Sequence, residues 1–167
     1  EQCPQALNSG MPVLLHYLNI GRNLGYDASH PTFTGCQTHR SGRATVLLCA
    51  HAANEQLFGA ERCLLDVLDA YVSLELNVVV SVPSAVNADY IGELRARARL
   101  VVCIPTMPWH ADIAPCSVAM ERFSKIIHAY EINVVHANTI MLREPLLAAR
   151  QAGIPSVIHI HESPAHD

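Results

Sequence analysis

Residues 44–50 read Ala-Thr-Val-Leu-Leu-Cys-Ala, and residues 57–75 read Leu-Phe-Gly-Ala-Glu-Arg-Cys-Leu-Leu-Asp-Val-Leu-Asp-Ala-Tyr-Val-Ser-Leu-Glu. The first segment is apolar without alternation, which indicates a strand buried on both faces. In the second segment, Leu64, Leu68 and Tyr71 recur at helical spacing and define one apolar face. Together they predict a buried strand followed by an amphipathic helix, the repeating unit of an α/β fold.

The same alternation continues to the end of the chain. It predicts strands at Thr45–Ala50, Asn77–Val82, Leu100–Ile104, Asn133–Ala137 and Ser156–His161, and helices at Ala60–Glu75, Ala88–Arg97, Val118–Tyr130 and Glu144–Ala152. We expect every strand to be buried on both faces, Asn87 and Ser117 to be helix N-caps, and Gly153 to end the last helix. The sequence therefore predicts an open, doubly wound parallel sheet of Rossmann-like type.

The composition limits the function classes. Half of the 167 residues are hydrophobic and 16% are charged, so the chain can bury the core of one ordinary domain. The formal net charge is −4, and the single lysine and the scattered arginines form no basic patch, so we expect no nucleic-acid partner. No apolar stretch approaches the ~18 residues of a membrane span, so we expect no membrane-spanning segment. No C-x-x-C pair occurs among the six cysteines, which favours a reducing, cytoplasmic location.

Residues 1–43 differ from the rest of the chain. They are rich in Gly, Asn, Ser, Thr and His and carry one short amphipathic stretch, residues 13–18. We interpret them as an irregular or helical extension, a spacer and linker appended to a domain at residues 44–167. Because the chain begins with Glu1 rather than methionine, we expect it to be a processed product or a segment of a longer protein.

Gly59 stands where the loop after the first strand meets its helix, at the sheet edge where such folds bind ligands. Bare backbone and the amides of the first helical turn could there approach an anion such as a phosphate. Alternatively, Gly59 only allows the loop to turn, and we weigh the two interpretations evenly. The chain lacks G-x-G-x-x-G, and its second strand ends in Ser81-Val82-Pro83 without an acid, which excludes a nicotinamide or flavin cofactor.

The fifth strand places His159 and His161 on one face, with Glu162 just beyond its end. His161 is the better placed for chemistry, since it could transfer a proton near neutral pH or hydrogen-bond a sugar hydroxyl, and Glu162 could orient it. We favour a core histidine with satisfied hydrogen bonds for His159. Trp109, in the loop 105–115, could stack on a sugar ring, although a loop tryptophan more often serves as a packing lid.

A metal site is the remaining alternative for these histidines. His136, His159 and His161 could bind a metal ion, because imidazole is a common ligand. The chain has no H-E-x-x-H, no cysteine pair and no carboxylate cluster at the strand ends. We therefore expect no metal and rank a small metal hydrolase last.

Four segments follow one another at the expected positions: Phe58-Gly59-Ala60-Glu61-Arg62, Val134-Val135-His136-Ala137-Asn138-Thr139, Ala148-Ala149-Arg150-Gln151-Ala152-Gly153-Ile154-Pro155 and His161-Glu162. With them, residues 44–167 resemble the N-terminal half of GT-B glycosyltransferases of family 4. The resemblance implies an acceptor-binding domain, partnered by a second Rossmann-like domain that binds the nucleotide-sugar donor and supplies a glutamate pair. It also implies transfer with retention of anomeric configuration, without a metal or cofactor.

The resemblance further implies roles for individual residues. His161 would be the catalytic residue that contacts the transferred sugar or the acceptor, and Gly59 would approach the donor phosphate. Phe58 stands where many members have a second glycine, and Asn138 and Thr139 would line the acceptor side. Since one wall of a cleft cannot hold both substrates, we expect the isolated chain to be inactive and to require the missing C-terminal donor domain.

The opening segment carries a second resemblance. His16-Tyr17-Leu18, Gly21, Gly25, Pro31 and Phe33 are similar to a spacer that recurs in large bacterial polysaccharide-assembly glycosyltransferases. This implies bacterial surface polysaccharide synthesis, a glycan or lipid-linked acceptor, and a cytoplasmic parent protein peripheral to the inner membrane face. The alternative is a non-catalytic carbohydrate-binding or scaffolding module, which should bind oligosaccharides by itself.

Overall fold

The computed structural model describes residue 16, residues 19–20, residue 23, residues 31–51, residue 53, residues 57–106 and residues 110–161. The chain divides into two compact units, Glu1–Pro31 and Thr32–Asp167. Most of the predicted spacer lies outside the described residues, and the second unit carries the sheet. No helix in the described ranges is long and apolar enough to cross a lipid bilayer.

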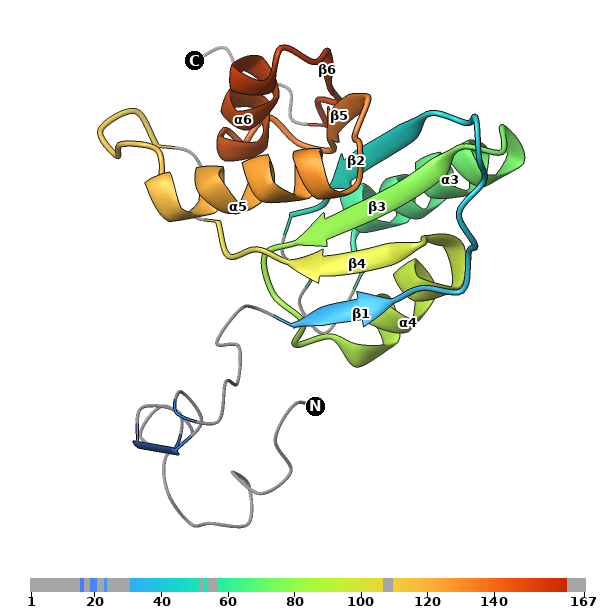
Figure 1. Cartoon of the computed structure of the whole chain (residues 1–167), viewed down its shortest axis with the longest axis horizontal. Coiled ribbons are helices and arrows are strands. Elements are labelled where there is room, and N and C mark those ends of the chain that lie inside the picture. Colours follow the sequence, from blue (N-terminus) through green and yellow to red (C-terminus); the bar gives the residue numbers. More distant parts are fainter. Residues whose placement is uncertain are drawn as a thin grey trace. The chain divides into compact units, whose positions relative to one another are not determined.

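The sheet has six strands in the order β1-β4-β3-β2-β5-β6 (Figure 1). The strands are β1 (Thr32–Thr34), β2 (Thr45–Cys49), β3 (Asn77–Val82), β4 (Leu100–Cys103), β5 (Val134–Ala137) and β6 (Ser156–Ile158). The helices that connect β2 to β6 are α3 (Gly59–Ser73), α4 (Ala88–Arg97), α5 (Ser117–Ala129) and α6 (Glu144–Ala152). Strands β2 to β6 run parallel, and β1 pairs antiparallel with β4 at one edge.

Helices cover both faces of the sheet, with α3 and α4 behind it and α5 in front of it in Figure 1. The central strand β2 shows how the sequence produces these layers. Leu47 packs in the cluster that contains Phe123 of α5, whereas Leu48 packs in the cluster that contains Leu64 of α3. Successive side chains of a strand point to opposite faces, so a strand that is apolar at every position serves two cores. The predicted doubly wound parallel sheet is confirmed.

The compact unit that carries the sheet begins at Thr32 rather than at residue 44. Residues 32–34 add an antiparallel edge strand, and the amide of Gly35 donates to Arg99 O at 2.9 Å. A Cβ atom on Gly35 would lie 1.9 Å from Ala98 O, so this close approach requires glycine. A three-residue strand is too short to produce a periodic signal, which is why the sequence did not predict β1.

Two local expectations were wrong. Strand β6 is exposed at all three residues rather than buried on both faces, because it lies at the sheet edge and β5 is its one neighbour among the strands that the structure describes. Ser117 is the first residue of α5 and not its N-cap, a position that Cys116 occupies. The predicted N-cap at Asn87 is confirmed, because its side chain accepts a hydrogen bond from the amide of Tyr90 at 2.9 Å. The predicted end of α6 at Gly153 is confirmed as well, because Gly153 is its C-cap and lies in the left-handed region.

Candidate functional site

The candidate site lies at the carboxyl edge of the sheet, where β2, β5 and β6 end and α3 begins. These three strands run parallel as neighbours, so their carboxyl ends meet at one edge. The edge brings together Gly59 at the start of α3, Asn138 after β5 and His161 after β6. The predicted site residues in the described ranges therefore lie in one region of the molecule.

Gly59 is the first residue of α3. Its φ lies outside the left-handed region that favours glycine, so the turn itself does not require this residue. Among the residues that the structure describes, none lies within 4 Å of a Cβ atom built at Gly59, so their packing does not require glycine either. The neighbouring Phe58 is 59% exposed. A glycine that neither backbone nor packing demands is consistent with close approach of a ligand.

A buried carboxylate organises the first turn of α3. The amide of Phe58 donates to Glu61 Oε2 at 2.9 Å, and His51 Nε2 lies 3.1 Å from Glu61 Oε1. The amide of Arg62 donates to Phe58 O and makes the first hydrogen bond of the helix. The amides of Gly59 and Ala60 precede that bond and point out of the helix end, as in any first helical turn.

Asn138 connects the three elements of the site. Its side chain is fully buried, Nδ2 donates to Ala60 O of α3 at 2.9 Å, and Oδ1 lies 3.3 Å from His161 Nε2. Its own amide donates to Cys49 O at the end of β2 at 3.0 Å. Asn138 therefore positions His161 against the start of α3. Thr139, 2% exposed, accepts a hydrogen bond from the amide of Met141 at 3.2 Å.

Three histidine rings form a row beside these residues. The His136 and His159 rings stack with centroids 6.1 Å apart, and the His159 and His161 centroids lie 4.2 Å apart. His136 Nδ1 lies 2.7 Å from the Tyr71 hydroxyl. Burial, with the nearby charges of His159 and His161 as smaller causes, lowers the pKa of His136 from its usual value. His136 is therefore held in the neutral form near pH 7.

Cys63 completes the cluster and was not predicted from the sequence. Its Sγ atom, on α3, lies 3.9 Å from Nδ1 of His159 in the segment after β6. The sequence did contain a signal, because Cys63 follows Gly59 by four residues and residues at that spacing share one helix face. Glu162 and Trp109, predicted as substrate-binding residues, lie outside the described residues and stay predictions.

The chain was compared with protein families and with solved structures, and both contain similar proteins. Residues 58–167 match the family described as glycosyl transferase 4-like domain. The crystal structure of MurG from Acinetobacter baumannii is similar in fold, with a TM-score of 0.55 and 15% sequence identity over 74% of this chain and 37% of that chain. A glycosyltransferase from Rickettsia africae gives a TM-score of 0.49 and 17% identity over 74% of this chain and 32% of that chain.

The chain thus spans about a third of the length of these solved structures. At such identities the likeness concerns the fold alone, and it confirms the predicted Rossmann-like half of a GT-B fold. No curated protein sequence matches the chain.

Proposed function

Because the chain belongs to the family of glycosyl transferase 4-like domains, we propose that it is the acceptor-binding half of a retaining glycosyltransferase. The parent protein would transfer sugar from a nucleotide-sugar to a glycan or lipid-linked acceptor in bacterial surface polysaccharide synthesis. The observation that carries this proposal is the link through Asn138, which holds His161 beside the first turn of α3. A lipid-linked acceptor would bring the parent to the inner face of the membrane.

The first turn of α3 is the part of the site that suits the donor. Its outward-pointing amides and the positive end of the helix dipole attract anions. In the proposed reaction they would face the diphosphate of a nucleotide-sugar held by a second domain. Negative charge grows on this diphosphate as the glycosidic bond breaks, and fixed amide donors stabilise such charge without reorganisation. The open space at Gly59 would let the diphosphate come close.

His161 is the residue proposed to meet the sugar. His161 is exposed in the segment after β6, and Asn138 Oδ1 lies 3.3 Å from its Nε2 and orients the ring. A histidine held this way can hydrogen-bond a sugar hydroxyl or transfer a proton near neutral pH. We propose Phe58, Thr139, Glu162 and Trp109 as further substrate-binding residues. We also propose that the isolated chain is inactive without a donor domain.

The test is the substitution His161→Ala in the full-length parent. We expect the transfer rate to fall by about two orders of magnitude or more, the usual effect of removing an acid–base group. The matched control is His128→Ala, because His128 is an exposed histidine near the far end of α5. Transfer rate and acceptor affinity that both stay at the parent's values would contradict the role of His161. Oligosaccharide binding by the isolated chain, with no transfer by the parent, would favour a carbohydrate-binding module instead.

A further inference from the structure

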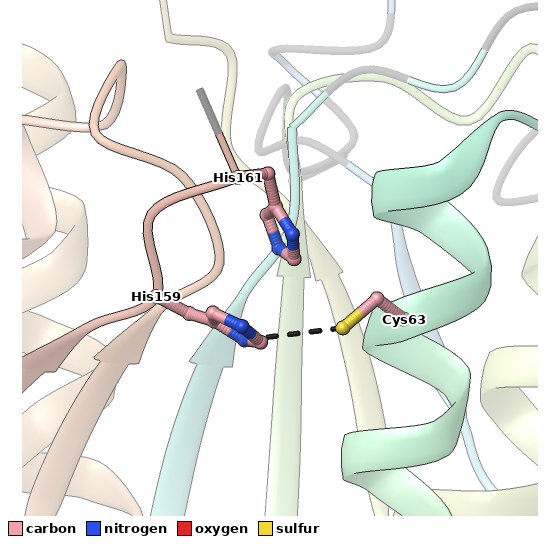
Figure 2. A group of neighbouring side chains, drawn as sticks. All are labelled: Cys63, His159 and His161. Carbon is pink, nitrogen blue, oxygen red and sulfur yellow. Dashed lines mark hydrogen bonds between the residues drawn. The ribbon is translucent and has the colours of Figure 1, made fainter. Parts of the chain in front are cut away.

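Cys63, His159 and His161 form a cluster whose side chains point toward one another from α3 and from the segment after β6 (Figure 2). We propose that these three residues bind a single zinc ion, through Cys63 Sγ and one ring nitrogen from each histidine. Neither the family match nor the proposed transfer reaction assigns such a site. The sequence pattern had indicated no metal, and the metal alternative that it left open contained His136 instead of Cys63.

The distances suit a tetrahedral zinc ion. One donor atom from each residue can be chosen so that all three lie within 4.8 Å of one another, and Cys63 Sγ lies 3.9 Å from His159 Nδ1. Zinc–sulfur bonds of about 2.3 Å and zinc–nitrogen bonds of about 2.0 Å place neighbouring donors roughly 3.3 to 3.6 Å apart. The separations between donors therefore have to shorten by at most about 1.5 Å, a change that small adjustments of the three side chains can share.

Surrounding contacts already orient both histidines. The amide of His159 donates to Ala137 O at 2.8 Å, which fixes its backbone to β5, and its ring stacks on His136. Asn138 Oδ1 lies 3.3 Å from His161 Nε2, so coordination through Nδ1 would keep this bond. A carbonyl oxygen that accepts the other ring N–H is the usual partner of a metal-bound histidine. Binding would thus require little new ordering of the chain.

The donor set determines which metal fits. A thiolate with two imidazoles suits zinc and related transition metals, whereas calcium and magnesium prefer oxygen donors. Three protein ligands leave a fourth position for water or another small ligand. If His161 also acts in the proposed transfer reaction, the metal-bound state withdraws it from that role. The metal site itself does not depend on that reaction and is tested without substrates.

Cobalt(II) is the probe, because it replaces zinc in tetrahedral sites and reports thiolate coordination by a charge-transfer absorption band. The untagged 167-residue chain is titrated after treatment with a chelator. We expect one cobalt ion per chain, with this band, in the unsubstituted chain. The band should persist in Cys116→Ser, the control at an exposed cysteine, and should be absent in Cys63→Ser. His159→Gln should weaken zinc binding at least about ten-fold. No band in the unsubstituted chain, or an equal band in Cys63→Ser, would overturn the proposal.

A second measurement uses only the unsubstituted chain, in case a variant fails to fold. The alkylation rate of each cysteine is followed by mass spectrometry with and without zinc. A bound ion should slow alkylation of Cys63 and leave the exposed Cys36 and Cys116 unchanged, because a metal-bound thiolate is a poor nucleophile. Equal rates at Cys63 with and without zinc would refute the site. Because neither donor nor acceptor is present, this outcome says nothing against the proposed transfer reaction.

Discussion

At the scale of single residues, we expect Gly59 to matter for the transfer reaction and not for stability. A Cβ atom at Gly59 would meet no described residue within 4 Å, and the φ of Gly59 lies outside the left-handed region, so Gly59→Ala should leave the melting temperature unchanged or slightly higher. In the full-length parent the added methyl group would hold the donor phosphate away from the amides of α3. We expect kcat/KM for transfer to fall roughly 10- to 100-fold, the effect of a misplacement near 1 Å.

The matched control for this substitution is Gly92→Ala. Gly92 lies on the exposed side of α4, and a Cβ atom there would likewise have no described residue within 4 Å. Thermal unfolding of both variants and initial-rate kinetics in the parent measure the two effects separately. If Gly59→Ala and Gly92→Ala retain the same kcat/KM, the backbone at Gly59 does not approach the donor.

At the scale of secondary-structure elements, strands of similar sequence lie in different environments. Val79 in β3 is fully buried between two strands and two helix layers, whereas Val157 in β6 is 49% exposed at the edge. Val79→Ala should lower the free energy of unfolding by about 2 kcal/mol through lost burial and a cavity. Val157→Ala should change it by no more than about 0.5 kcal/mol. Urea denaturation of both variants measures the difference, and a loss at Val157 as large as at Val79 would mean that β6 is covered in solution.

At the scale of the whole molecule, the fold resists alkali until buried acids ionise. Cys49 lies in the central strand between both helix layers, and burial raises the pKa of its thiol from 9.0 to about 12. Burial also raises the pKa values of Tyr71 and Tyr90, the latter with a smaller contribution from Glu61. The unfolded chain therefore releases these protons at lower pH than the folded chain, so stability is fully present below about pH 9 and declines toward pH 12.

Above the pKa of Cys49 in the unfolded chain, the effect of this residue alone should lower the free energy of unfolding by up to about 1.4 kcal/mol per pH unit. Urea denaturation at about pH 8 and about pH 10.5 measures the decline. In Cys49→Ala the decline between the two pH values should be smaller by about 2 kcal/mol, although that variant starts from a lower stability because of the cavity. Cys36→Ala, at an exposed cysteine, should lose as much stability between the two pH values as the unsubstituted chain does. Equal declines in all three proteins would show that Cys49 ionises without unfolding.

The sequence by itself determined the parallel strands, the helices between them and their layers, but not the edge strand β1. The apolar run at residues 45–49 and the helical spacing of Leu64 and Leu68 are local patterns. A run without alternation indicates a strand buried on both faces, and a period of 3.6 residues indicates the buried face of a helix. The same patterns predicted α4, α6 and β3 with their observed bounds. They also placed Gly59, Asn138 and His161 at one edge, because parallel strands end together.

Only the tertiary structure decided which of these side chains meet. Cys63 and His159 are 96 residues apart in sequence, and their contact depends on the position of β6 beside β5 and on the rotation of α3, which no local pattern specifies. The same holds for the burial of Asn138 and for the exposure of β6, whose apolar sequence resembles that of the central strands. Local periodicity reports the preference of one segment for burial, whereas contacts between distant segments depend on the packing of all of them at once.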